Sequence, residues 1–147
     1  GSPCSNGAGE LPLFNPDLEL QIPTEVLALH TQVAAADALR VASPEYAHGV
    51  TGTIKNLLDW LVGFEPFAGK PAVVYNASPR SHIADAALRD TLKTMSAVIV
   101  ESASISLPLL GMGLSESGMV ASAPVSLAIK ASLAALSRSV ERSRIAF

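Results

Sequence analysis

The sequence has 147 residues, of which 49% are hydrophobic and 16% charged, which suits one folded domain and excludes a disordered chain. Its net charge of −3 and isoelectric point near 5.5 argue against nucleic acid or an anionic membrane as the main partner. Mean hydropathy is +0.37, but the longest uncharged stretch, residues 102–115, is too short and too interrupted to span a bilayer. With one cysteine and no visible signal peptide, the sequence predicts a cytoplasmic protein without an internal disulfide.

Short apolar runs alternate with helical patterns along the chain, after a turn-rich first segment that contains Pro12 and Pro16. The expected elements are helices from about residue 24, over 51–61, over 83–95 and over 125–140, and buried strands at 37–43, 71–78 and 97–102. Stripes of apolar residues define the helices: Ile22, Val26, Leu29 and Val33; Ile54, Leu57, Leu58 and Leu61; Ile83, Ala87, Leu88, Leu92 and Met95; Val125, Ile129, Leu133, Leu136 and Val140.

This alternation predicts an α/β fold, in which helices cover both faces of a parallel sheet. Such sheets bind ligands beyond the carboxyl ends of their strands. The loop that starts at Ser43 follows the first strand, and the loop at 76–80 follows the second. Since parallel strands end at one edge, we expect these two loops to form the walls of one crevice.

The stretch "SPEYAHGVTGTIKNLLDW" (43–60) resembles the Pro-Glu-Tyr loop and the following Lys-Asn…Asp-Trp helix of the NAD(P)H-dependent FMN reductases. Three further segments are similar to this family and occur in the right order: "LPLFNPDLE", "AADALRVASPEY" and "GKPAVVYNASP". The resemblance covers roughly residues 10–100. It implies a single flavodoxin-like domain over 1–147, a three-layer sandwich with a parallel sheet. The family includes quinone, chromate and azo-compound reductases.

The resemblance implies that the loop after Ser43 lines the isoalloxazine ring of FMN, with Tyr46 as a flat wall. Gly49 and Gly52 are expected to allow close approach and unusual torsions, and Thr51 to cap the following helix. The family usually has Asn at the position of Ala47. The alternative for Tyr46 is an ordinary turn with the ring packed on the core. The expected cofactor contacts in this loop are Pro44, Glu45, Tyr46, Ala47 and His48.

The loop at 76–80 contributes Ser78 and Arg80, which form either an ordinary turn or a contact with the flavin's pyrimidine edge or the nicotinamide. At the N-terminus, Ser2, Ser5 and Asn6 resemble fragments of the family's phosphate-binding loop. A flavodoxin-like sheet without its first strand would expose two unpaired edges. We therefore expect the physical chain to contain residues that are absent from the printed numbering; the alternative is a truncated relative.

By this resemblance, the chain is expected to transfer hydride from NAD(P)H through bound FMN to a quinone or a similar small acceptor. A homodimer or homotetramer is expected as well. The alternative is a flavodoxin-like module that binds no FMN and acts through oligomer or partner contacts. A receiver domain is disfavoured because Asp37 lies at the wrong end of its strand, and the three histidines show no metal-ligand spacing. No side-chain acid or base is assigned to catalysis, because the cofactor carries that chemistry.

Overall fold

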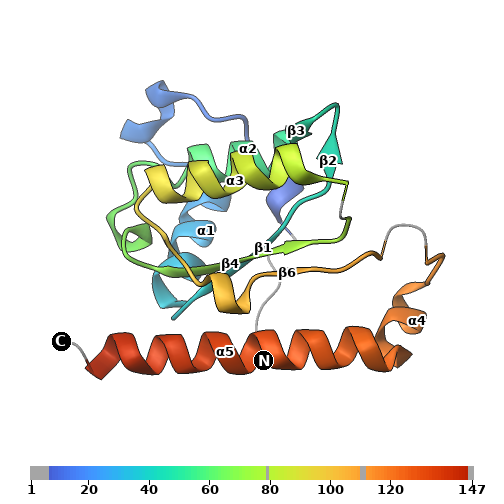
Figure 1. Cartoon of the computed structure of the whole chain (residues 1–147). Helices are drawn as coiled ribbons and strands as arrows, with labels where there is room; N and C mark the ends of the chain where they lie inside the picture. The colour runs from blue at the N-terminus through green and yellow to red at the C-terminus, as the bar shows by residue number, and fades with distance from the viewer. Residues whose placement is uncertain (1–6, 79, 110–111, 146–147) are drawn as a thin grey trace.

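The computed structural model describes residues 7–78, 80–109 and 112–145, which form three layers (Figure 1). A parallel sheet lies between α5 on one face and α1, α2 and α3 on the other, as the sequence predicts. The helices are α1 (Thr24–Ala35), α2 (Gly52–Asp59), α3 (His82–Thr94), α4 (Glu116–Ala121) and α5 (Ala123–Ile145). The strands are β1 (Leu39–Ala42), β2 (Glu45–Tyr46), β3 (Gly49–Val50), β4 (Pro71–Asn76), β5 (Val98–Ile99) and β6 (Ile105–Ser106). The short 3-10 helices are η1 (Ala8–Glu10), η2 (Pro16–Leu20), η3 (Glu65–Phe67) and η4 (Glu101–Ala103).

Strand β4 is the centre of the sheet in the described part of the chain. It pairs in parallel with β1 on one side and with β5 and β6 on the other. The strand expected at 97–102 is wrong in its extent, because η4 interrupts it after Ile99 and pairing resumes at Ile105. The Ser104 hydroxyl fills the gap in the ladder: it accepts a hydrogen bond from the Val74 amide at 3.1 Å.

Alternate residues of β4 build two separate cores, because successive side chains of a strand point to opposite faces. Ala72 and Val74 belong to the larger core, under α1, α2 and α3. Val73 and Tyr75 face α5, where they pack with Leu136 in the smaller core. The two clusters confirm that both faces of β4 are covered.

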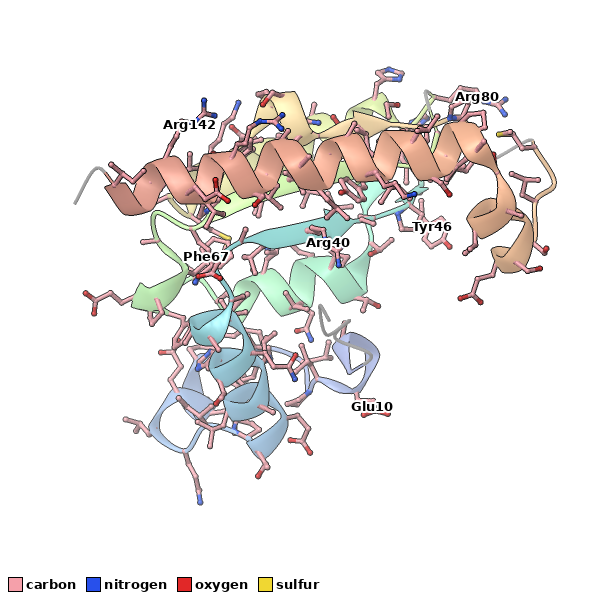
Figure 2. The ribbon with its side chains drawn as sticks, turned by 90° about the horizontal axis from the view of Figure 1, so that it is seen from below. Glu10, Arg40, Tyr46, Phe67, Arg80 and Arg142 are labelled. Carbon is pink, nitrogen blue, oxygen red and sulfur yellow. The ribbon has the colours of Figure 1, made fainter. Side chains whose placement is uncertain are left out.

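Strand β1 is less buried than the sequence predicts. Leu39 and Val41 pack against the larger core, whereas Arg40 and Ala42 are exposed on the other face. Figure 2 shows why: α5 lies beside β1 in this view, and Arg40 emerges next to the helix. The pattern therefore alternates, as it does in a strand with one covered face.

Two of the helical stripes are also displaced. In α3 the buried positions are Ala84, Leu88 and Leu92, four residues apart, whereas Ile83 is 42% exposed and Ala87 is exposed as well. In α5 the expected core residue Leu133 is 40% exposed, and its neighbours Ser132 and Ala135 are buried instead. The buried faces of α3 and α5 include small residues, namely Ala84, Ser132 and Ala135. A pattern that counts only large apolar side chains therefore assigns the wrong face of each helix to the core.

No helix in the described ranges combines the length and the apolar character that crossing a membrane requires.

Candidate active site

The two loops chosen from the sequence lie at the same edge of the sheet. Strands β1 and β4 are parallel, with Ala42 opposite Tyr75, so both strands deliver the following residues to one side. Figure 2 shows Tyr46 and Arg80 at that same end of the molecule. The predicted direction of the two loops is confirmed.

The first loop folds into a small antiparallel hairpin. Glu45 pairs with Val50 and Tyr46 pairs with Gly49. The turn between the strands consists of Ala47 and His48, which both adopt left-handed backbone conformations, with φ of 49° and 59°. Two consecutive residues with positive φ are typical of the tight turn that matches strand twist.

The position of the unusual torsions differs from the sequence-based expectation, which assigned them to Gly49 and Gly52. Neither glycine has a positive φ; the two residues just before Gly49 have it instead. For residues with a Cβ, such a conformation costs about 1–2 kcal/mol each. The hairpin therefore needs contacts elsewhere to hold it.

Tyr46 projects from this hairpin into solvent. The residue is 70% exposed, so the alternative that packs the ring on the core is wrong. The neighbouring Pro44, Ala47 and His48 are exposed as well, and the His48 side chain is 77% exposed. A flat aromatic surface thus stands just beyond the end of β1, on a short and firmly paired support.

Glu45 points the other way, toward α3. Its side chain is only 10% exposed, and its Oε2 accepts a hydrogen bond of 2.8 Å from the Ala84 amide. Its Oε1 lies 3.2 Å from Nδ1 of His48. The bond from the Ala84 amide lowers the pKa of the Glu45 carboxyl below its ordinary value, and His48 adds to the effect. The carboxylate is therefore ionised and fully engaged within the protein.

The second loop is organised by Asn76, at the end of β4. Its Oδ1 accepts from the Ser78 amide at 2.9 Å, and its Nδ2 donates to the Ser81 carbonyl at 3.1 Å. Ser78 is buried, and its hydroxyl accepts from the Arg80 amide at 3.3 Å. Arg80 is exposed. The signal for Asn76 was present in the sequence, because an Asn that ends a strand commonly forms such a turn.

The remaining expected contacts, Ser2, Ser5 and Asn6, lie outside the described residues. Thr51 does cap α2: its hydroxyl accepts from the Ile54 amide at 3.4 Å, as expected. No group of three or more potential metal ligands occurs within residues 7–78, 80–109 and 112–145.

Asn56 of α2 and Trp60, which directly follows this helix, have a role that the sequence analysis did not predict. The Asn56 side chain accepts from the Phe14 amide and donates to the Pro12 carbonyl. The indole of Trp60 also donates to the Pro12 carbonyl, at 2.8 Å, and stacks edge-on against Phe14. These contacts fasten the N-terminal segment onto α2. The sequence shows that Asn56 and Trp60 are about one helical turn apart, but it does not show that both contact residues 12–14.

The two described cavities lie away from these loops. One, of about 410 Å³, has Leu61, Phe67 and Met95 in its lining, and the other, of about 380 Å³, has Asp37 and Lys70. Asp37, Phe67, Lys70 and Met95 lie shortly before β1, β4 or β5, so both cavities are at the amino edge of the sheet. The candidate site at the carboxyl edge is exposed around Tyr46.

The described part of this surface offers one of the features that a flavin ring needs. An isoalloxazine needs a flat apolar wall and polar backbone groups at its pyrimidine end. The exposed ring of Tyr46 offers a flat wall. The amides of Ser78 and Arg80 are already bonded within the neighbouring turn, so this turn offers the exposed Arg80 side chain at the same edge. The phosphate end of FMN would need a nest of amides that these residues do not include.

Comparison with known proteins gives the family. Residues 6–109 match the NADPH-dependent FMN reductase family, which is more than half of the chain. The chain belongs to this family. It is also similar to a flavoenzyme NAD(P)H:(acceptor) oxidoreductase from Paracoccus denitrificans, with a TM-score of 0.70 and 25% identity over 92% of this chain and 78% of that one.

The chain is also similar in sequence to two curated relatives. An NAD(P)H-dependent FMN reductase of Pseudomonas aeruginosa is 42% identical over 71 residues, which are 46% of this chain and 38% of the relative. A quinone reductase of Escherichia coli is 36% identical over 73 residues, 47% of this chain and 39% of the relative. The matched region spans less than two fifths of either relative's length.

Proposed function

We propose that this chain is part of an FMN-dependent oxidoreductase, which uses NAD(P)H to reduce a quinone or a similar small acceptor. Bound at the surface around Tyr46, FMN would supply the hydride-transfer and electron-transfer chemistry of such a reaction. The observation that carries the proposal is the exposed Tyr46, held on a hairpin at the carboxyl edge of the sheet beside the loop at 76–81. Membership of the NADPH-dependent FMN reductase family supports the same assignment.

The residues of the chain orient the ring and exclude water from one side of it. Tyr46 covers part of the flat surface, while Pro44, Ala47 and His48 present the hairpin backbone to it. Because the Ser78 hydroxyl and the Ser78 and Arg80 amides are bonded within the turn, the turn contributes the exposed Arg80 side chain. Glu45 contributes through its contacts with the protein, since both its oxygens are occupied.

The quinone acceptor is proposed from the names of curated relatives, such as the quinone reductase of Escherichia coli. An open surface beside Tyr46 suits two planar molecules that occupy it in turn, first the nicotinamide and then the acceptor. A homodimer or homotetramer and a cytoplasmic location remain predictions. The alternative of a module without FMN predicts that the purified chain shows no flavin affinity.

The test is a titration of the purified chain with FMN, followed by flavin fluorescence and by the visible spectrum after addition of NADPH. We expect saturable binding and bleaching of the flavin band. Tyr46→Ala should weaken FMN binding roughly three- to tenfold, the usual loss for one aromatic stacking partner. Leu20→Ala removes an apolar side chain from a residue that is 98% exposed away from these loops, and should leave binding unchanged. Equal affinities for the wild type and Tyr46→Ala would refute the role of Tyr46.

A further inference from the structure

The start of α3 lacks the cap that a helix normally supplies for itself. An N-cap side chain usually accepts a hydrogen bond from the second or third amide of its helix. Ser81 occupies the N-cap position of α3, and its side chain makes no such bond. The amide of Ala84, the third residue of the helix, donates instead to Glu45, which lies 39 positions away in the chain.

Glu45 therefore caps α3 from another part of the fold. Its carboxylate lies near the positive end of a 13-residue helix, a favourable place for a negative charge. The same carboxylate contacts His48 at the turn of the hairpin through its other oxygen. One side chain thus joins the helix start, the first hairpin strand and the strained turn.

These contacts connect the two loops of the candidate site. The loop at 76–81 ends at Ser81, the N-cap of α3, and the bond from the Asn76 side chain to the Ser81 carbonyl ties the end of β4 to that N-cap. The hairpin that carries Tyr46 is held to α3 by Glu45. The helix start is consequently the shared reference point for both walls of the site.

We propose that Glu45 is a positioning residue, which sets the place of Tyr46 relative to the loop at 76–81 by clamping the hairpin to the start of α3. The proposal rests on the proposed flavin site, since it specifies how the wall of that site is held. The side chain acts through the hairpin backbone and does not touch the cofactor.

A merely structural cap would act on the stability of α3 alone, and a double variant separates the two roles. Glu45→Ala removes both contacts. Adding Ser81→Asp gives α3 a local N-cap, because Asp at that position accepts from the helix's own amides. The double variant should regain the thermal stability that Glu45→Ala loses, while the hairpin remains unclamped. Glu65→Ala, which removes an exposed acid at the opposite edge, is the matched control.

The readouts are thermal unfolding, FMN affinity and amide hydrogen exchange. We expect Glu45→Ala to weaken FMN binding roughly tenfold and to speed exchange in the hairpin at residues 46–49. In the double variant, unfolding temperature and protection of the Ala84 amide return, but FMN affinity and hairpin protection do not. Glu45→Gln, whose amide oxygen can still accept from Ala84, should retain most of the affinity.

Recovery of both FMN affinity and hairpin protection in the double variant would overturn the proposal, and would make Glu45 a cap only. If the wild-type chain binds no FMN, the proposed function fails, but the exchange measurement still decides. Rapid hairpin exchange beside a protected Ala84 amide then supports the positioning role, whereas an unchanged hairpin overturns it.

Discussion

Phe14 and Asn56 are joined by a hydrogen bond of 2.8 Å from the Phe14 amide to the Asn56 side-chain oxygen, across 42 positions of the chain. The nitrogen of the Asn56 side chain donates to the Pro12 carbonyl at 3.1 Å. Asn56 thus pairs with the extended segment much as a neighbouring strand would. This bond gives a physical reason for the Asn in the Lys-Asn…Asp-Trp helix.

Replacing Asn56 by Ala should lower the free energy of unfolding by about 1–2 kcal/mol, because the half-buried Phe14 amide loses its acceptor. The Pro12 carbonyl keeps the Trp60 indole as a donor. Chemical denaturation measures this loss. Lys55→Ala is the control: the adjacent side chain forms only an exposed pair with Asp59, which is worth about 0–1 kcal/mol. Equal losses of stability in the two variants would contradict a stabilising role of the Asn56 contacts.

Ser132 should be the polar residue of α5 whose loss destabilises the protein most. It is 2% exposed, shares a hydrogen bond of 2.7 Å with the Tyr75 hydroxyl, and donates to the Ala103 carbonyl. Ser132→Ala leaves two groups without this partner, at an expected cost of about 1–3 kcal/mol. Ser137→Ala, on the exposed side of the same helix, should change stability little. Thermal unfolding of both variants checks the prediction, and an unaltered melting temperature for Ser132→Ala would count against it.

Ala47→Gly should stabilise the hairpin. The residue has a φ of 49°, which a side chain with a Cβ disfavours and Gly tolerates. Against this gain stands the greater freedom of Gly in the unfolded chain, so we expect a net gain of about 0.5–1 kcal/mol. The measurement is the unfolding free energy, with Ala86→Gly as control: that exposed position within α3 should lose about 1 kcal/mol. A loss at Ala47 of similar size would show that the turn is not strained.

The Glu45 carboxylate should make the protein more sensitive to acid. Its pKa is lowered in the folded state, chiefly by the Ala84 amide, so its contribution to stability is present above the ordinary carboxyl pKa and is lost as the pH falls through the folded value. In Glu45→Gln this dependence disappears. Unfolding measured from about pH 7 down to about pH 3 should therefore show the two proteins converging at the acid end. A constant difference over the whole range would exclude the linkage.

Periodicity and strand order predicted most of the fold, because the larger core is built from long apolar side chains at regular spacing. The direction of β1 and β4 could also be derived, and with it the shared edge of the two loops. The break in the third strand could not, since it depends on the Ser104 hydroxyl replacing a backbone partner of Val74. The exposure of Arg40 depends on where α5 lies, which no local pattern contains.

The candidate site shows a similar division. The residues of the Pro-Glu-Tyr loop and their common location were available from the sequence, and the exposure of Tyr46 agrees with its expected role. The inward direction of Glu45 was not, because its partner is a backbone amide of a helix that begins 37 positions later, at His82. Every residue except proline has a backbone amide, so the sequence around Ala84 does not show that its amide binds Glu45.

The most direct test of a shared flavin site is a map of FMN binding by amide chemical shifts. Labelled protein is titrated with FMN, and the shifts of residues 45–50 and 80–84 are compared with those of Lys70 and Ser96 at the opposite edge of the sheet. A shared flavin site predicts saturable shifts in both loops with one common affinity, and none at the opposite edge. Shifts confined to the opposite edge, or two loops that respond with different affinities, would contradict it.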